Sequence, residues 1–218
     1  MKAIKLLMVL FIIGTIQSYA GGVKSIEVAN GIIQIKSSNK TKVAYTIDDE
    51  KQNLSSKDTH MLVYGLDLYT NGVEKQYCLR MGVRNIPVGI FHGKVPVAYI
   101  PSYAKILLKM VDDSVIELTS VLNSIESETD YCANFLLQEN TLYKIFDGVK
   151  KIRLEIINFD QKTGIVKKEF RDVNYEKDKF GRDIKEWYDD INKEYAKKGD
   201  ELLKKIKVST ITNIKEGF

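Results

Sequence analysis

Residues that commonly carry catalysis or metal binding are sparse in this chain of 218 residues. His60 and His92 are the only histidines, and neither belongs to a short-spaced pattern of the kind that holds zinc. No G-x-S-x-G nucleophile motif occurs, so a Ser/His/Asp triad would have to be assembled from separate segments. Gly-rich phosphate loops with a strand before and a helix after them are also missing. We therefore expect no cofactor and no metal, and the balance favours a protein that is not an enzyme.

Paired carboxylates are the second chemistry to consider. Glycoside hydrolysis needs two carboxyl groups roughly 5–9 Å apart, and a chain with 29 acidic residues meets that spacing by chance. Glu117 and Glu155 lie within apolar runs, where outward-facing strand residues that pair with lysines are the simpler interpretation. A small secreted hydrolase with a dispersed active site therefore remains the alternative function.

Aromatic residues offer a third possibility, the binding of a ligand. The chain has 12 tyrosines and one tryptophan. Tyr99 and Tyr103 flank Pro101 in an irregular stretch and are the best candidates for exposed binding residues, although packing at a sheet edge is the simpler interpretation. Trp187 falls on the apolar face of a helical pattern, which favours packing in the core.

Cys78 and Cys132 are the only cysteines. Strand alternation places Cys78 on one face with Arg80 and Cys132 on one face with Asn134, so both thiols are expected on the more polar side of a sheet. In an exported protein they could form a cross-strand disulfide. Two unpaired thiols are equally consistent with the pattern, and a catalytic thiol is disfavoured because no C-x-x-C motif occurs.

The first 20 residues have the three parts of a secretory signal peptide. Lys2 and Lys5 precede the apolar run 6–13, and Ser18 and Ala20 are the small residues of a cleavage site. The run is too short for a membrane-spanning helix, which needs about 20 apolar residues. We expect a mature chain of residues 21–218 that has no membrane span and is secreted or periplasmic.

The charge of the mature chain gives no reason to expect a nucleic-acid partner. Cleavage after residue 20 removes two lysines, which lowers the formal charge from +4 to +2. The many charges of residues 161–207 are well mixed in sign, as on a solvated surface rather than along a phosphate-binding stripe.

Period-two alternation from residue 22 to about residue 174 predicts many short strands. Turn signals at Asn30-Gly31, Asn71-Gly72 and Asp112-Asp113 predict three antiparallel hairpins. A short helix is expected near 140–147, with Asn140 as its cap and Gly148 at its end. The expected fold is mainly β, an antiparallel sandwich or a barrel-like sheet.

One long amphipathic helix is expected at about 178–206. Apolar residues recur there at helical spacing, and Gly199 allows either one helix or a break. The helix should lay its aromatic face on the β body, so residues 21–218 are predicted to form a single β-rich domain with a C-terminal helical segment.

Two segments resemble an uncharacterised family of secreted β-rich proteins from gut Bacteroides-type bacteria. They are the double strand 104–119 (AKILLKMVDDSVIELT) and the short helix followed by a strand at 143–155 (YKIFDGVKKIRLE). The resemblance implies a secreted β-rich fold in a bacterial envelope, and it brings no catalytic residues. With catalytic motifs sparse, we expect a non-catalytic envelope or surface protein, a binding module whose partner is an envelope protein or a glycan.

Overall fold

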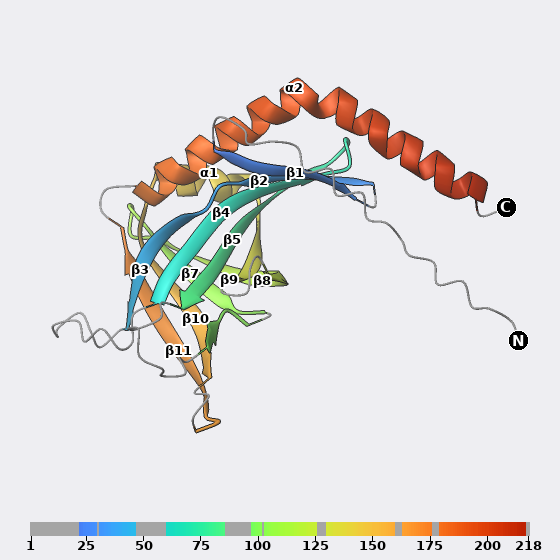
Figure 1. The fold of residues 1–218 in the computed structure, drawn as a ribbon. Coiled ribbons are helices and arrows are strands. Elements are labelled where there is room, and N and C mark those ends of the chain that lie inside the picture. Colours follow the sequence, from blue (N-terminus) through green and yellow to red (C-terminus); the bar gives the residue numbers. More distant parts are fainter. Residues whose placement is uncertain are drawn as a thin grey trace, which may run out of the picture.

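The computed structural model describes residues 22–29, 31–46, 60–85, 97–101, 103–125, 130–159, 163–175 and 179–216. The fold is mainly β, as expected, with one long C-terminal helix (Figure 1). Its elements are β1 (Val23–Ala29), β2 (Ile32–Ser37), β3 (Lys40–Thr46), β4 (His60–Thr70), β5 (Lys75–Asn85), β6 (Val97–Tyr99), β7 (Lys105–Met110), β8 (Val115–Ile125), β9 (Asp130–Leu137), α1 (Glu139–Asp147), β10 (Val149–Phe159), β11 (Val166–Asn174) and α2 (Lys179–Glu216).

The strands close into a barrel-like ring. The sheet runs in the order β4-β3-β11-β10-β7-β8-β9-β5, and β5 pairs again with β4. All of these pairings are antiparallel. The hairpin β1-β2 extends the sheet beside β4, and β6 pairs with the end of β10. Closure leaves few free strand edges, which limits unwanted pairing with other chains.

β2 and β3 follow one another along the same side of β4, with an irregularity between them. Lys36 lies opposite Asp67 and Lys40 lies opposite Tyr64. Four steps along β2-β3 therefore match three steps along β4, which is the count of a β-bulge. The bulge spans Ser37 to Asn39, and the chain passes there from the β1-β2 hairpin into the barrel.

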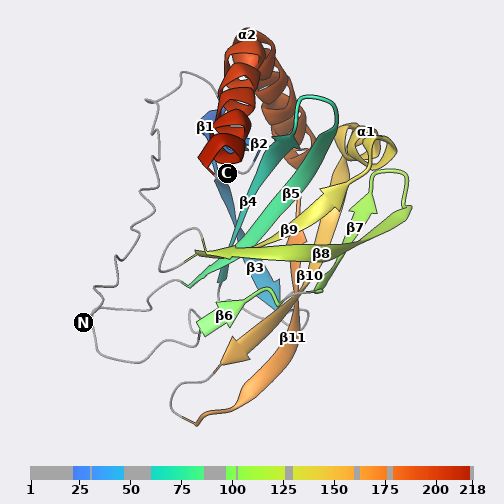
Figure 2. The same cartoon turned by 90° about the vertical axis from the view of Figure 1, so that its right-hand side faces the viewer.

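α2 packs along the end of the barrel, over β1, β2 and β4 (Figures 1 and 2). Phe180, Ile184, Trp187 and Ile191 of this helix are buried in the same core cluster as the inward-facing strand residues. Their spacing follows the 3.6-residue period of a helix, so the expected aromatic face is confirmed. Burial of each large side chain contributes about 1.5–3 kcal/mol to the drive for folding.

The helix boundaries differ from expectation in two places. Gln138, not Asn140, is the cap of α1, and Asn140 lies within the helix, while Gly148 ends it as expected. α2 runs unbroken through Gly199 and continues to Glu216, ten residues beyond the predicted end. The β-branched residues after Lys207 favour strands weakly, and the continuing helix overrides that preference.

Candidate functional site

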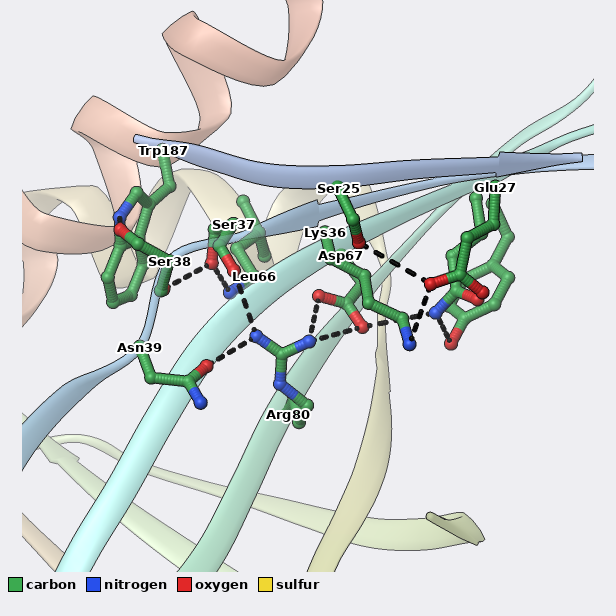
Figure 3. Close-up of polar contacts among 12 residues, drawn as sticks. Ser25, Glu27, Lys36, Ser37, Ser38, Asn39, Leu66, Asp67, Arg80 and Trp187 are labelled. Carbon is green, nitrogen blue, oxygen red and sulfur yellow. Dashed lines mark hydrogen bonds and ion pairs between the residues drawn. The ribbon is translucent and has the colours of Figure 1, made fainter. Parts of the chain in front are cut away.

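A buried polar network lies at the bulge, on the face of β4 and β5 opposite the main core (Figure 3). The Arg80 guanidinium donates from Nη1 to Asp67 Oδ1 at 2.7 Å and Oδ2 at 3.0 Å. Its Nη2 donates to the Ser37 carbonyl at 3.1 Å and to Asn39 Oδ1 at 2.7 Å. The side chains of Arg80 and Asp67 are each 1% exposed. The network therefore joins β5 to both ends of the bulge.

Gly65 makes room for this network. A Cβ atom at residue 65 would lie 2.5 Å from Arg80 Nη2 and 2.9 Å from Ser37 Oγ. The Ser37 hydroxyl accepts the Leu66 amide at 2.8 Å, so it satisfies a backbone donor beside the bulge. These contacts are those of a structural clasp, because the two Nη atoms of Arg80 and the Asp67 carboxylate are held by fixed partners within a buried site.

Two segments of the chain match the S-x-x-K spacing of serine–lysine catalysis, Ser37 to Lys40 at the bulge and Ser102 to Lys105. That motif needs the serine hydroxyl and the lysine amine to meet. The Ser37 hydroxyl donates to the Ser38 carbonyl at 2.9 Å, and Lys40 Nζ donates to Asp183 Oδ1 at 2.6 Å. The first pair is thus kept apart, and Ser102 lies outside the described residues.

Polar contacts fasten α2 to the barrel beside its aromatic face. Asp183 accepts from the Tyr64 hydroxyl at 2.8 Å, in addition to Lys40. Burial, followed by the contact with Asp183, raises the pKa of Tyr64 well above the usual range of a phenol. The Trp187 indole donates to Ser38 Oγ at 3.2 Å (Figure 3). These contacts hold α2 in position on the barrel.

The structure describes only some of the residues that the sequence suggested as sites. Tyr103 is 78% exposed in the turn before β7; Tyr99 ends β6, and its side chain lies outside the described part. His92 and the side chain of His60 also lie outside it. Glu117 pairs with Lys105 at 2.7 Å and Glu155 with Lys168 at 3.0 Å, as the lysine-pairing interpretation expected.

The two cysteines lie on neighbouring strands, at different levels. Cys78 is opposite Leu136, and Cys132 is opposite Gly82. Four residues of strand separate the two levels, about 13 Å, whereas a disulfide requires Cα atoms within about 7 Å. Cys78 and Cys132 are therefore not joined to each other. Both are buried, at 3% and 1% exposure, so the polar sheet face on which the sequence placed them is not a solvent-exposed face.

The burial of the cysteines has a physical cause on the same sheet face. Arg80 and Asn134 share that face with them, and both are buried as well. The polar residues beside the two cysteines thus belong to the buried surroundings of Arg80, and they do not indicate a face that is exposed to solvent. Burial, followed by the charge of Asp67, raises the pKa of Cys78 to about 12, so this thiol stays protonated and is a poor nucleophile.

A cluster of four aromatic side chains, here called the aromatic cluster, joins α1, α2 and β5. Its members are Tyr77, Tyr143, Phe146 and Tyr188. The ring centroids of Tyr77 and Tyr188 are 5.0 Å apart, those of Phe146 and Tyr188 are 5.3 Å apart, and those of Tyr143 and Phe146 are 5.7 Å apart. α1 and α2 lie side by side at the same end of the barrel (Figure 2), which brings these four rings together.

Unlike the core aromatics, the aromatic cluster reaches the surface. Tyr143 is 49% exposed, and the other three members are partly buried. By contrast, Tyr64, Phe180 and Trp187 are at most 2% exposed. Hydrogen bonding to Tyr188, then the contact with Glu139 at 3.2 Å, raises the pKa of the exposed Tyr143 phenol, so it remains a neutral donor.

Polar groups border the aromatic cluster on α2 and β5. The Tyr77 hydroxyl donates to Asn192 Oδ1 at 2.7 Å, and Asn192 is held by a bond from its Nδ2 to the Tyr188 carbonyl at 2.8 Å. Lys75 Nζ lies 3.4 Å from Asn192 Oδ1 and 4.7 Å from the centre of the Tyr195 ring. The surface therefore has an apolar centre, hydroxyl and amide groups, and one cation at its border.

No group of three or more potential metal-ligating side chains occurs among the described residues. Neither of the two helices, as far as the structure describes them, is both long and apolar enough to cross a membrane.

Comparisons with protein-family models, with curated proteins and with solved structures found no match to this chain.

Asp172 on β11 supports a prediction of pH-dependent stability. Burial disfavours its ionisation, but hydrogen bonds from Arg153 at 2.8 Å and Lys151 at 3.1 Å outweigh burial and lower its pKa. Ionised Asp172 thus stabilises the fold above the unfolded-state pKa of about 3.9, and this stability is lost as the pH falls through the lower folded-state value. Asp172→Asn should lower the free energy of unfolding at pH 7, with a smaller difference from wild type near pH 2–3 in urea titrations. An equal difference at both pH values would contradict this role.

Proposed function

We propose that the chain is an exported, non-catalytic protein of a bacterial envelope or surface, and that it binds a partner protein through the aromatic cluster. The supporting observation is the half-exposed Tyr143, whose ring contacts Phe146 at the end of a connected series of four rings on α1, α2 and β5. Tyrosine is enriched at the energetic centres of protein interfaces because it combines apolar area with a hydroxyl and loses little conformational entropy.

The ring geometry favours a protein partner over a glycan. The interplanar angles are 45° for Tyr77 and Tyr188, 59° for Phe146 and Tyr188, and 83° for Tyr143 and Phe146. The contacting rings therefore meet at tilted or edge-to-face angles, and these pairs do not form one flat platform. A sugar needs an open, flat ring face on which to stack, whereas edges and hydroxyls suit the mixed chemistry of a protein surface.

Export is supported by the N-terminal pattern of Lys2, Lys5, the apolar run 6–13 and the small residues before Gly21. The scarcity of catalytic motifs, and the placement of Glu117 and Glu155 in ion pairs with lysines, speak for binding rather than hydrolysis.

A pull-down of residues 21–218 from an envelope extract of the producing organism tests the proposal, with the bound proteins measured by mass spectrometry. Tyr143→Ser should reduce recovery of the partner about tenfold or more, because truncating an interface hot spot costs about 2 kcal/mol or more. Tyr103→Ser is the matched control, since it removes a more exposed tyrosine that is not a member of the aromatic cluster.

Lower recovery with Tyr103→Ser than with Tyr143→Ser would instead place the contact surface at the turn before β7. Equal recovery with both variants, or recovery of no specific protein where a known envelope complex is recovered, would contradict the proposal. In the second case, binding of wild type to a glycan array would identify a sugar as the partner.

A further inference from the structure

Gly22, the first described residue, is bound through both of its backbone polar groups. Its amide donates to Asp190 Oδ2 of α2 at 2.7 Å, and its carbonyl accepts the Ser38 amide at 2.6 Å. Val23, the next residue, is buried and is the first residue of β1, which lies along α2 (Figure 1). The start of the described chain is therefore held between the helix and the bulge.

Glycine is required at residue 22 because the backbone lies directly against α2. A Cβ atom there would be 2.6 Å from Trp187 Cδ1 and 2.8 Å from Asp190 Oδ2, closer than real Cβ atoms approach their neighbours. The Trp187 side chain is buried in the core and its indole donates to Ser38 Oγ, so the ring has no free space into which to move. The contact between Gly22 and Asp190 is thus part of the packed fold.

The predicted cleavage site places a new positive charge next to this contact. Cleavage after Ala20 makes Gly21 the first residue, and an α-amino group with a pKa of about 7.7–8.0 is mostly protonated at neutral pH. One residue of chain spans at most about 3.6 Å, and the Gly22 amide nitrogen is 2.7 Å from the carboxylate. The new ammonium therefore lies within roughly 6.5 Å of Asp190 in any conformation of Gly21.

The carboxylate of Asp190 lies in a row of acidic residues along α2. Spaced three or four residues apart, as neighbours on one side of a helix are, its members are Asp183, Glu186, Asp190 and Glu194. Lys40 pairs with the first two, and Lys198 pairs with the last at 2.9 Å. Among the described residues no lysine or arginine side chain pairs with Asp190, whose hydrogen bond there comes from the Gly22 amide. The row can therefore accept one more cation.

We propose that Asp190 binds the N-terminal ammonium created when the signal peptide is removed, so that cleavage after Ala20 stabilises the fold. Opposite charges within about 4–6 Å of each other favour both charged forms. In the uncleaved chain the nitrogen of Gly21 belongs to a neutral amide, so this ion pair cannot form. The inference rests on the proposed export, which makes Gly21 the first residue of the mature protein.

Thermal unfolding of two chains, each with no added residues, tests the inference. One consists of residues 21–218, and the other of residues 17–218, in which four further residues separate the ammonium from Gly22. At low salt the shorter chain should melt about 2–4 °C higher, the shift expected for one ion pair in a domain of this size. Asp190→Asn keeps an oxygen that accepts the Gly22 amide but removes the charge, so it should abolish the difference between the two chains.

Asp189→Asn is the matched control, because it removes the neighbouring acidic residue, which pairs with Lys185 at 2.6 Å. This variant should keep the difference between the two chains. Equal melting of the two wild-type chains, or a difference that persists in Asp190→Asn, would overturn the inference.

N-terminal sequencing of the protein recovered from the producing organism separates this inference from the proposed function. A chain that still begins at Met1 would contradict the proposed export, and the inference with it. A chain that begins at Gly21 but melts like residues 17–218 would overturn the inference alone.

Discussion

Asp67→Ala is expected to lower the free energy of unfolding by about 3–5 kcal/mol, the cost of leaving a buried charge without its partner. Arg80 and Asp67 are each 1% exposed, so water cannot take over the lost contact. The Arg80 guanidinium also holds the Ser37 carbonyl and the Asn39 side chain across the bulge. Losing the carboxylate therefore leaves a buried charge unpaired and also weakens the bulge where β2 passes into β3.

Two controls isolate the effect of burial. Glu117→Ala breaks the Lys105 pair, in which both side chains are about half exposed, and should cost less than about 1 kcal/mol. The double variant Asp67→Leu with Arg80→Met replaces the pair by apolar side chains and should recover much of the lost stability. Urea unfolding of the three variants measures these differences. A loss after Asp67→Ala as small as that after Glu117→Ala would show that the pair does not stabilise the bulge.

Gly181→Ala should destabilise the protein by about 3 kcal/mol, whereas Gly199→Ala should stabilise it by about 0.5–1 kcal/mol. Both glycines lie within α2, where alanine is the better helix former. At residue 181, however, a Cβ atom would overlap the Ile145 carbonyl oxygen and lie 3.1 Å from the Phe146 carbonyl oxygen, which are backbone atoms of α1. At residue 199 the nearest neighbour is the Tyr195 ring at 3.4 Å, an ordinary contact.

If glycine-to-alanine changes the free energy of unfolding in opposite directions at these two positions of α2, the effect of helix propensity is separated from the effect of packing between helices. Thermal unfolding of the two variants is sufficient to measure them. Gly181→Ala should also weaken partner binding, because Phe146 and Tyr188 meet across the same α1–α2 contact. Stabilisation by both substitutions would mean that α1 and α2 do not approach as closely as described.

Local sequence patterns were sufficient to predict the β-rich class, because strand alternation and turn residues act over a few neighbours. The turns at Asn71-Gly72 and Asp112-Asp113 join hairpins as predicted. The amphipathic period around Trp187 also located α2 and its buried face.

Features that depend on contacts between distant segments could not be predicted in this way. Strand alternation correctly placed Cys78 and Arg80 on one sheet face. The polar residues on that face suggested exposure to solvent, whereas the structure buries the face around the Arg80–Asp67 ion pair. Asp67 of β4 and Asn39 of the bulge accept hydrogen bonds from Arg80 and so offset the cost of burying its charge. The partners of a buried charge are brought together only by the sheet topology.

The aromatic cluster is a second such case. Tyr77 and Tyr188 are 111 residues apart and meet only after the barrel closes and α2 docks. Helical spacing indicates that Tyr188 lies near the buried face of α2, but no local signal shows that Tyr143 of α1 will extend that surface.

Site-specific photo-cross-linking in living cells tests the central claim, binding through the aromatic cluster, most directly. A benzophenone amino acid replaces Tyr143 in one strain and Tyr103 in another, and both strains are irradiated before analysis. We predict a discrete covalent adduct with one envelope protein from position 143, and none from position 103. An adduct from position 103 alone, or no adduct from either position in cells that export the protein, would contradict the account.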